Sequence, residues 1–66
     1  MRVAFDIRSG RRVVSRQIAA TTREALIEYL RGLGCRDDEI MTMGTAAVCW
    51  RGAVYTAAPS GDAPEH

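Results

Sequence analysis

Alternation of apolar and polar residues marks the start of the chain. Residues 2–8 switch at every position between bulky apolar side chains and polar or small ones, which is the period of a half-buried strand. Ser9-Gly10 is a turn signal, and residues 11–20 continue as a second strand-like segment. The first third of the chain therefore predicts a β-hairpin.

The register of this hairpin decides which side chains reach the core. A two-residue loop at the turn would place Phe5 opposite Val14, so Val14 and Ile18 are expected to share its apolar face. Arg12 and Arg16 then fall on the margin of the same face, where their long side chains must extend toward water. Two charges in these positions predict that the second strand lies at a sheet edge or contains a bulge.

Helical spacing replaces the alternation in residues 21–34. The apolar residues now recur every three or four positions and form one stripe: Leu26, Tyr29, Leu30 and Leu33. Thr21 and Glu24 have the spacing of a capping box, in which the Thr21 hydroxyl accepts from the Glu24 N–H and the Glu24 carboxylate accepts from the Thr21 N–H. Gly34 is expected to adopt the left-handed conformation that closes many helices.

Strand-like alternation returns after the helix, in three short segments: residues 39–43, 46–50 and 53–58. Gly44-Thr45 and Arg51-Gly52 suit two-residue turns between them. The order ββαβββ predicts a single α+β domain over residues 1–58. We expect an antiparallel sheet of five strands, made of a β-hairpin and a three-stranded meander, with one helix packed on one face. Two smaller sheets folded into a partial barrel are the alternative that the sequence leaves open.

The expected sheet has one face that the helix does not cover. The predicted registers place six residues of the last three strands there: Ile40, Thr42, Ala47, Cys49, Val54 and Thr56. The residues that alternate with them, from Met41 to Ala57, are expected to face the helix. This set is more apolar than a solvated face usually is, so it is expected to meet a partner unless the curvature of a small sheet hides it. In the first two strands the same side is expected to carry Arg2, Arg8, Arg11, Ser15 and Gln17. An apolar patch beside an arginine-rich hairpin is typical of a protein-binding surface.

The net charge of +1 hides an uneven distribution. Residues 1–23 contain six arginines and one acid, whereas residues 24–66 contain three arginines and seven acids. The guanidinium group suits carboxylates and phosphates. The partner-binding candidates are Arg2, Arg8, Arg11, Arg12, Arg16, Trp50 and Arg51. For Trp50, the competing interpretation is a cap over the core at a strand end.

Residues that usually carry catalysis are sparse. The only histidine is His66, in residues 59–66, which begin with proline and are expected to form a flexible tail. Without an internal histidine, the common general base and its nucleophile pairs are missing. Cys35 and Cys49 form no CxxC pair and are poor candidates for metal ligands. The acidic residues 37–39 lack the spacing of a calcium loop. We expect a non-enzyme with no catalytic residue, no metal site and no cofactor.

Location is predicted from two further features. No apolar run approaches the ~20 residues that span a bilayer, and the first residues lack the apolar segment of a signal peptide. We therefore expect a cytoplasmic protein with free thiols and no membrane partner.

In its size, its ββαβββ order, its lack of an active site and its charged surface, the chain resembles the small single-domain proteins of phages and mobile elements, including anti-CRISPR proteins. The resemblance implies an inhibitor that blocks a host nucleoprotein machine by stoichiometric binding. It transfers no residue, because no motif carries it, and the basic hairpin departs from the acidic members that imitate nucleic acid. Antitoxins and small transcriptional modulators fit the same description.

The favoured partner is a protein or nucleoprotein complex, bound through the sheet face or the hairpin edge. A nucleic-acid-binding regulator that uses the basic hairpin is the second hypothesis. Arginines spread over a broad continuous surface would favour nucleic acid, whereas arginines around an apolar patch would favour a protein. A homodimer formed through the uncovered face is a further alternative.

Overall fold

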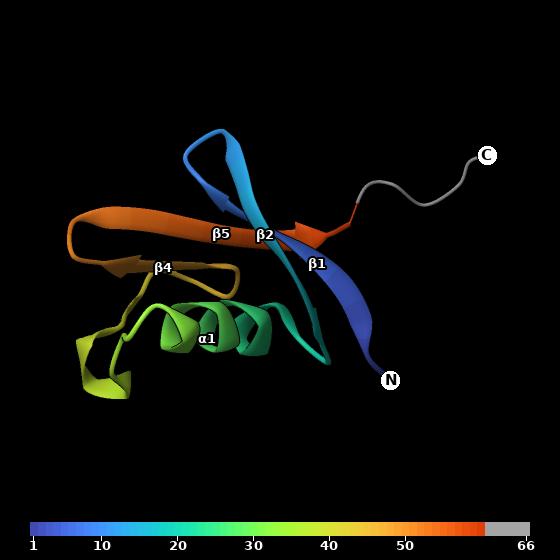
Figure 1. The fold of residues 1–66 in the computed structure, drawn as a ribbon, viewed down its shortest axis with the longest axis horizontal. Coiled ribbons are helices and arrows are strands. Elements are labelled where there is room, and N and C mark those ends of the chain that lie inside the picture. Colours follow the sequence, from blue (N-terminus) through green and yellow to red (C-terminus); the bar gives the residue numbers. More distant parts are fainter. Residues whose placement is uncertain (61–66) are drawn as a thin grey trace.

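One helix lies against one face of a five-stranded antiparallel sheet in the computed structural model, which describes residues 1–60 (Figure 1). The elements are β1 (Val3–Ser9), β2 (Arg12–Ala19), α1 (Thr22–Gly32), a short 3-10 turn η1 (Asp37–Glu39), β3 (Met41–Thr42), β4 (Ala47–Trp50) and β5 (Ala53–Pro59). The predicted ββαβββ order is confirmed, with one sheet instead of two. Most of the predicted tail, residues 61–66, lies outside the described residues.

The strand order β2-β1-β5-β4-β3 joins the two halves of the chain, because β1 pairs with β2 on one side and with β5 on the other. The sheet is strongly twisted, and the β1–β2 hairpin crosses the direction of β4 and β5 at a steep angle (Figure 1). α1 runs along β4 and β5, and it also contacts β1 and β2. A single short helix can therefore cover most of one face.

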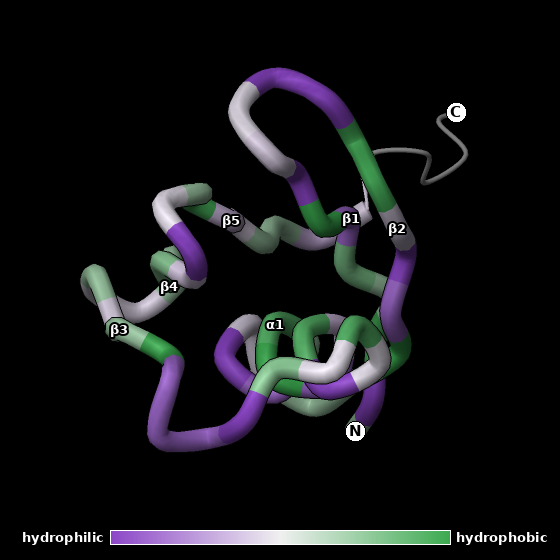
Figure 2. Tube along the Cα trace, turned by 60° about the vertical axis from the view of Figure 1, so that its left-hand side comes forward, coloured by the Kyte–Doolittle hydropathy of each residue, from purple (hydrophilic) through white to green (hydrophobic). Residues whose placement is uncertain are grey.

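The core lies between α1 and this face of the sheet. Its buried residues are Phe5, Ile7, Ala19, Ala25, Leu26, Leu30, Cys35, Val48, Trp50 and Ala57. Tyr29 of α1 packs at the margin against Tyr55 of β5, with ring centroids 5.9 Å apart. The most hydrophilic stretches of the chain are the tip of the β1–β2 hairpin and the connection from α1 to β3 (Figure 2).

The start of α1 follows the predicted capping box with one difference. Thr21 is the N-cap, and its hydroxyl accepts a hydrogen bond of 3.1 Å from the Glu24 N–H. The Glu24 carboxylate accepts from the N–H of Ala20 at 3.3 Å, one residue before the predicted donor. Both bonds still satisfy backbone donors that the helix leaves unpaired.

The end of α1 forms a Schellman motif around Gly34. Gly34 has a positive φ of 96°, which confirms the predicted left-handed cap. Its N–H donates to Arg31, and the N–H of Cys35 donates to Leu30. Leu33, predicted on the apolar stripe, is instead exposed because the chain turns away at this point.

The predicted register of the β1–β2 hairpin is wrong. Phe5 lies opposite Gln17, not Val14. A β-bulge between Ile7 and Arg8 contributes to the change, because it places one extra residue in β2. The predicted edge position of β2 and the predicted bulge are both confirmed.

The extra residue turns over the remainder of β2, since successive side chains of a strand point to opposite faces. Val14 and Ile18, predicted in the core, are 38% and 55% exposed, respectively. Ala19 is the residue of β2 that enters the core instead. Ser15 and Gln17, predicted on the uncovered face, lie opposite Ile7 and Phe5 on the α1 side.

A similar one-residue difference occurs in the β3–β4 hairpin, whose loop has one residue more than the predicted two. Thr42 pairs with Val48, so it faces α1, and its hydroxyl accepts from Arg23 at 3.1 Å. Met41 pairs with Cys49 and faces the other way. Met41 was predicted on the helix side and Thr42 on the uncovered side, and both assignments are wrong.

Candidate interaction surface

The side of the sheet opposite α1, here called the outer face, is more apolar than the sequence predicts. The registers place on it Ala4, Asp6, Arg8, Val13, Arg16, Ile18, Met41, Ala47, Cys49, Val54, Thr56 and Ala58. Its large apolar side chains are exposed, with Met41 at 66% and Val54 at 42%. Ile40, predicted on this face, instead packs against the core.

Sequence reasoning missed the part of the outer face that β2 supplies. The sequence assigns Ile18 to the core because its register was drawn for an unbroken two-residue hairpin, although the two arginines indicated an edge or a bulge. The position of Arg16 contained the signal that could have corrected this, since a charge on a buried face argues for a bulge, and a bulge reverses the faces of a strand. Arg16 lies on the outer face, where its Nε is 3.2 Å from Oδ1 of Asp6.

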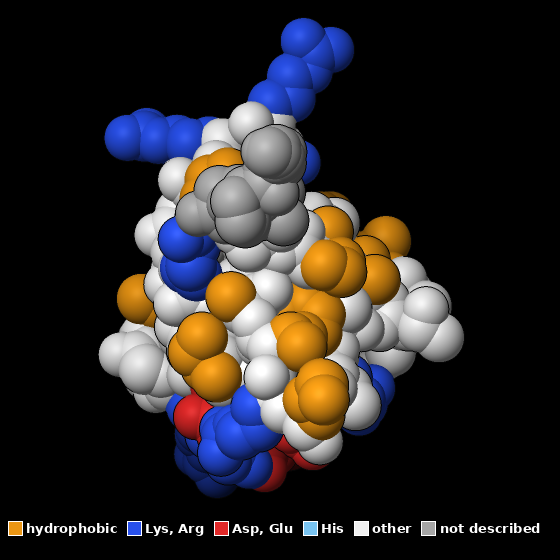
Figure 3. All heavy atoms as spheres, turned by 90° about the vertical axis from the view of Figure 1, so that its right-hand side faces the viewer, with side chains coloured by type: hydrophobic (Ala, Val, Ile, Leu, Met, Phe, Trp, Pro, Cys, Tyr) orange, Lys and Arg blue, Asp and Glu red, His pale blue; other side chains and the backbone are white. Residues whose placement is uncertain are grey.

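Arginines lie around these apolar residues. Arg8 is on the outer face opposite Val13 and Thr56. The guanidinium of Arg2 donates to the Ile18 carbonyl at 3.2 Å, so it lies against β2. Figure 3 faces the end of the molecule where the N-terminus lies; it shows hydrophobic side chains across its middle and arginine side chains that extend beyond the surface at the hairpin end. The structure thus brings Arg2, Arg8 and Arg16 close to an apolar patch.

The hairpin tip carries two further arginines of the predicted set, Arg11 and Arg12. Its two-residue loop is Gly10 and Arg11, with Arg12 pairing back to Ser9, one residue later than predicted. Gly10 has a φ of 65°, which suits glycine at this turn. Within residues 1–60, Arg8, Arg11 and Arg12 make no ion pair. The tip is therefore a cationic group open to solvent.

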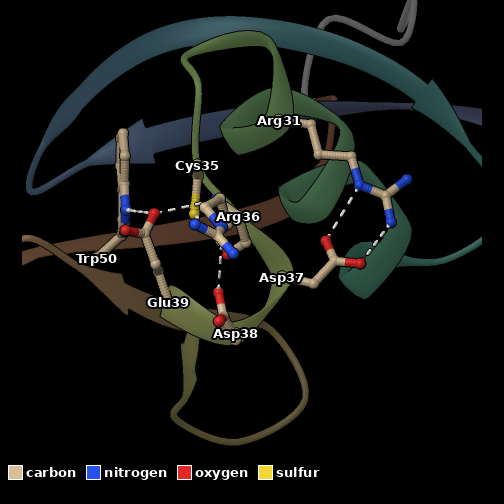
Figure 4. Close-up of polar contacts among 7 residues, drawn as sticks. All are labelled: Arg31, Cys35, Arg36, Asp37, Asp38, Glu39 and Trp50. Carbon is tan, nitrogen blue, oxygen red and sulfur yellow. Dashed lines mark hydrogen bonds and ion pairs between the residues drawn. The ribbon is translucent and has the colours of Figure 1, made fainter.

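Trp50 and Arg51 do not belong to this surface. Trp50 is 7% exposed and lies on the α1 side of the sheet, where its indole N–H donates to Oε1 of Glu39 at 3.3 Å (Figure 4). The Arg51 guanidinium lies over the Trp50 ring, 4.7 Å from its centroid. Trp50 is therefore a cap over the core, in agreement with the competing interpretation of the sequence.

The connection from α1 to β3 is held by its own charges. Glu39 accepts from the Arg36 N–H at 3.0 Å as well as from Trp50, and these bonds lower the pKa of Glu39 below its usual 4.5. Asp37 accepts from Arg31 at 2.9 and 3.2 Å, which lowers the pKa of the Asp37 carboxyl (Figure 4). The acidic residues 37–39 therefore stabilise a turn of the chain.

The two thiols differ in environment, and both are free. Cys35 is buried at the helix exit, where desolvation and then the nearby Glu39 raise the pKa of its thiol, so it stays protonated at neutral pH. Cys49 is half-buried on the outer face. Residues 1–60 enclose no pocket and contain no group of three metal-ligating side chains. No helix in this part of the chain is long and apolar enough to cross a membrane.

Comparisons of this chain with protein-family models, with curated proteins and with solved structures give no match.

Proposed function

We propose that this protein is a small non-enzymatic binding protein that acts by stoichiometric association with a protein or nucleoprotein target. The observation that carries the proposal is the outer face, where exposed apolar side chains lie among arginines. Interfaces combine an apolar centre with arginine anchors, so this arrangement favours a protein partner over a bare phosphate backbone. A role as a phage-type inhibitor of a host defence complex, of the anti-CRISPR kind, falls within this proposal.

A nucleic-acid-binding regulator is the second candidate, and the hairpin tip favours it. Arg11 and Arg12 extend a cationic group away from the sheet, as a phosphate contact requires. The tip, however, presents a small cationic area, and the arginines of α1 and of the connection from α1 to β3 lie elsewhere in the fold. These arginines therefore do not extend it into a broad basic surface. The observation therefore supports nucleic acid as part of a nucleoprotein target more than as the sole partner.

Affinity capture tests the two candidates against each other. The tagged chain is incubated with a host lysate, with and without nuclease, at low and high salt. One defined partner retained in fixed stoichiometry after nuclease and at high salt is the expected result. Capture that vanishes with nuclease and falls steeply with salt would transfer the proposal to nucleic acid.

Two matched variants connect capture to the outer face. Val54→Asp places a charge in the apolar part of the outer face, and Leu33→Asp makes the same change at an exposed apolar residue beyond the end of α1. We expect Val54→Asp to abolish capture and Leu33→Asp to preserve it. Equal capture by both variants would contradict the outer face as the binding surface.

A further inference from the structure

β2 is a long open edge of the sheet. It pairs with β1 on one side only, and no other strand of residues 1–60 lies beside it. Five of its eight residues are exposed. The opposite edge is β3, which has only two residues. Of the two edges, β2 is therefore the one with enough length to pair with another strand.

The registers show which backbone groups of β2 point outward. The Ser60 N–H donates to the Ala4 carbonyl at 2.9 Å, so Ala4 directs its backbone groups away from β2. Ile18 lies opposite Ala4 and must therefore direct its N–H and C=O away from β1. The direction alternates along a strand, so Arg16 does the same. The Arg2 guanidinium donates to the Ile18 carbonyl at 3.2 Å, so an added strand would replace this exposed side-chain bond with a main-chain one.

The bulge leaves this part of the edge intact. Pairing with β1 is regular from Ala19 to Ser15, and the irregularity begins only toward the turn. Bulges often protect an edge from unwanted pairing. Here the bulge would limit an added strand to the half of β2 that contains Arg16 and Ile18.

Side-chain chemistry changes along the edge. Ile18 presents an exposed apolar side chain at one end, and the turn end carries the cations of Arg11 and Arg12 beside the exposed Val13 and Val14. A complementary segment would carry apolar residues beside Ile18 and carboxylates toward the turn. A second copy of this chain fits poorly, because antiparallel self-pairing centred on Arg16 would place Ala20 and Thr21, which carry no carboxylate, opposite the cations of the turn.

We infer that the edge of β2 accepts an extended acidic segment of a partner protein, which would add a strand to the sheet. This mode of recognition uses main-chain hydrogen bonds for affinity and alternate side chains for specificity. The inference rests on the proposed function and names the class of partner segment. Its contacts would be the backbone groups of Arg16 and Ile18, the Ile18 side chain and the cations of the turn.

A peptide titration followed by NMR tests the inference on the purified chain. The probe is a synthetic peptide of about eight residues, with valine and threonine in the half that would pair beside Ile18 and glutamate in the half that would extend past the bulge toward the cations of the turn. We expect the largest shift changes, and slower hydrogen exchange, at the Arg16 and Ile18 amides. A peptide with lysine in place of glutamate should bind at least about tenfold more weakly. No response at these amides, or equal binding of the lysine peptide, would overturn the inference.

Backbone methylation separates strand addition from simple charge attraction. Two further peptides carry N-methyl groups on alternate amides. In the first peptide these amides point to one edge of the extended chain, and in the second they point to the opposite edge. Only one edge can face β2, so one peptide should bind like the parent and the other at least about tenfold more weakly. Equal affinities for the two would overturn strand addition, and this test needs no change to the protein.

A variant of the protein tests the main-chain hydrogen bonds of the added strand from the side of β2. Ile18→Pro removes an N–H that points away from β1, a position where proline is tolerated in an edge strand. Ile18→Thr shortens the apolar side chain and keeps the N–H. We expect the proline variant to lose peptide binding and the threonine variant to retain most of it, with melting temperatures measured for both. If the proline variant does not fold, the two methylated peptides decide.

The outcomes also separate this inference from the proposed function. Capture of a protein from the lysate without any peptide response at β2 would overturn the edge inference alone. Failure of the lysate capture, with the peptide still bound at β2, would overturn the proposed function alone. Changes at the Arg16 and Ile18 amides that follow protein concentration without peptide would identify a second copy of the chain as the occupant and overturn the acidic partner.

Discussion

The two charged ends of the molecule use arginine in opposite ways. At the end that contains η1, the Arg31 guanidinium donates to the Asp37 carboxylate, and Nε of Arg36 lies 3.7 Å from Oδ1 of Asp38. The Arg51 guanidinium lies over the Trp50 ring. At the tip of the β1–β2 hairpin, the arginines make no ion pair with any residue that the structure describes. The arginines at the η1 end therefore stabilise the connection from α1 to β3, whereas those at the hairpin tip are exposed to solvent.

This difference follows from the uneven distribution of acids along the chain. Three of the acids lie next to one another in residues 37–39, directly after the helix, where Arg31 and Arg36 are their neighbours. Asp6 is the one acidic residue of residues 1–23, and it pairs with Arg16 in the middle of the hairpin, away from the arginines of the tip. Substitutions at the η1 end should therefore change stability, and substitutions at the tip should change binding.

The largest effect is expected from Trp50→Ala. The substitution removes a buried ring, its hydrogen bond to Glu39 and the surface on which Arg51 rests. Loss of a buried aromatic side chain costs about 3–5 kcal/mol, a large share of the stability of a domain this small. Urea denaturation at neutral pH should show a largely unfolded variant or a much lower midpoint. A loss below about 1 kcal/mol would contradict the role of Trp50 in the core.

A smaller, pH-dependent effect is expected from Glu39→Gln. The Arg36 N–H and the Trp50 indole stabilise the ionised carboxylate and lower its pKa in the folded protein. The contribution of Glu39 is therefore complete above the usual pKa of 4.5 and is lost as the pH falls through the lower, folded value. The variant should be less stable than the wild type at pH 7 and should lose less stability on acidification.

Urea midpoints measured between neutral pH and about pH 3 test this expectation. Glu28→Gln, at an exposed position of α1, controls for the loss of one carboxylate. Identical pH dependence for Glu39→Gln and the wild type would show that the bonds to Glu39 do not stabilise the fold.

A still smaller effect is expected from Arg31→Ala. Its two hydrogen bonds to Asp37 fasten the connection to the end of α1, but both side chains are more than half exposed. Exposed ion pairs contribute little, since water and salt screen them. The melting temperature should fall slightly at low salt, and the difference should shrink at high salt. A difference that does not depend on salt would assign the effect to packing.

The sequence predicts the element types and the caps of the fold well, because those depend on neighbours in the chain. Thr21, Glu24 and Gly34 act within one turn of the helix, and strand alternation is visible over a few residues. The faces of β2 and β3 were wrong, because they depend on a bulge and on one extra loop residue. Neither leaves a local signal as strong as alternation, and each shift of one residue exchanges the two faces.

The candidate surface was predicted in outline and not in composition. The arginines of the hairpin were identified from their clustering in the sequence; Arg8, Arg11 and Arg12 lie at or near its tip, whereas Arg16 lies midway and Arg2 reaches Ile18 at the other end. Ile18 and Met41 were assigned to the helix side because their faces were inverted. The hydrogen bond from Trp50 to Glu39 joins β4 to a turn, a contact that no spacing rule in the sequence predicts.

The smallest effect on stability is expected at the hairpin tip, where the comparison of the two ends can be broken most directly. Arg11→Ala removes a side chain that makes no ion pair within residues 1–60, so the free energy of unfolding should change by less than about 0.5 kcal/mol. Gly10→Ala, in the same turn, is the matched control, because the φ of 65° at Gly10 is costly for alanine, by about 1 kcal/mol. Urea denaturation of both variants, combined with lysate capture, separates a structural from a binding role. If Arg11→Ala destabilised the protein as much as Gly10→Ala, the tip arginines would be structural like those at the η1 end. That result would contradict the prediction that substitutions at the tip change binding and leave stability almost unchanged.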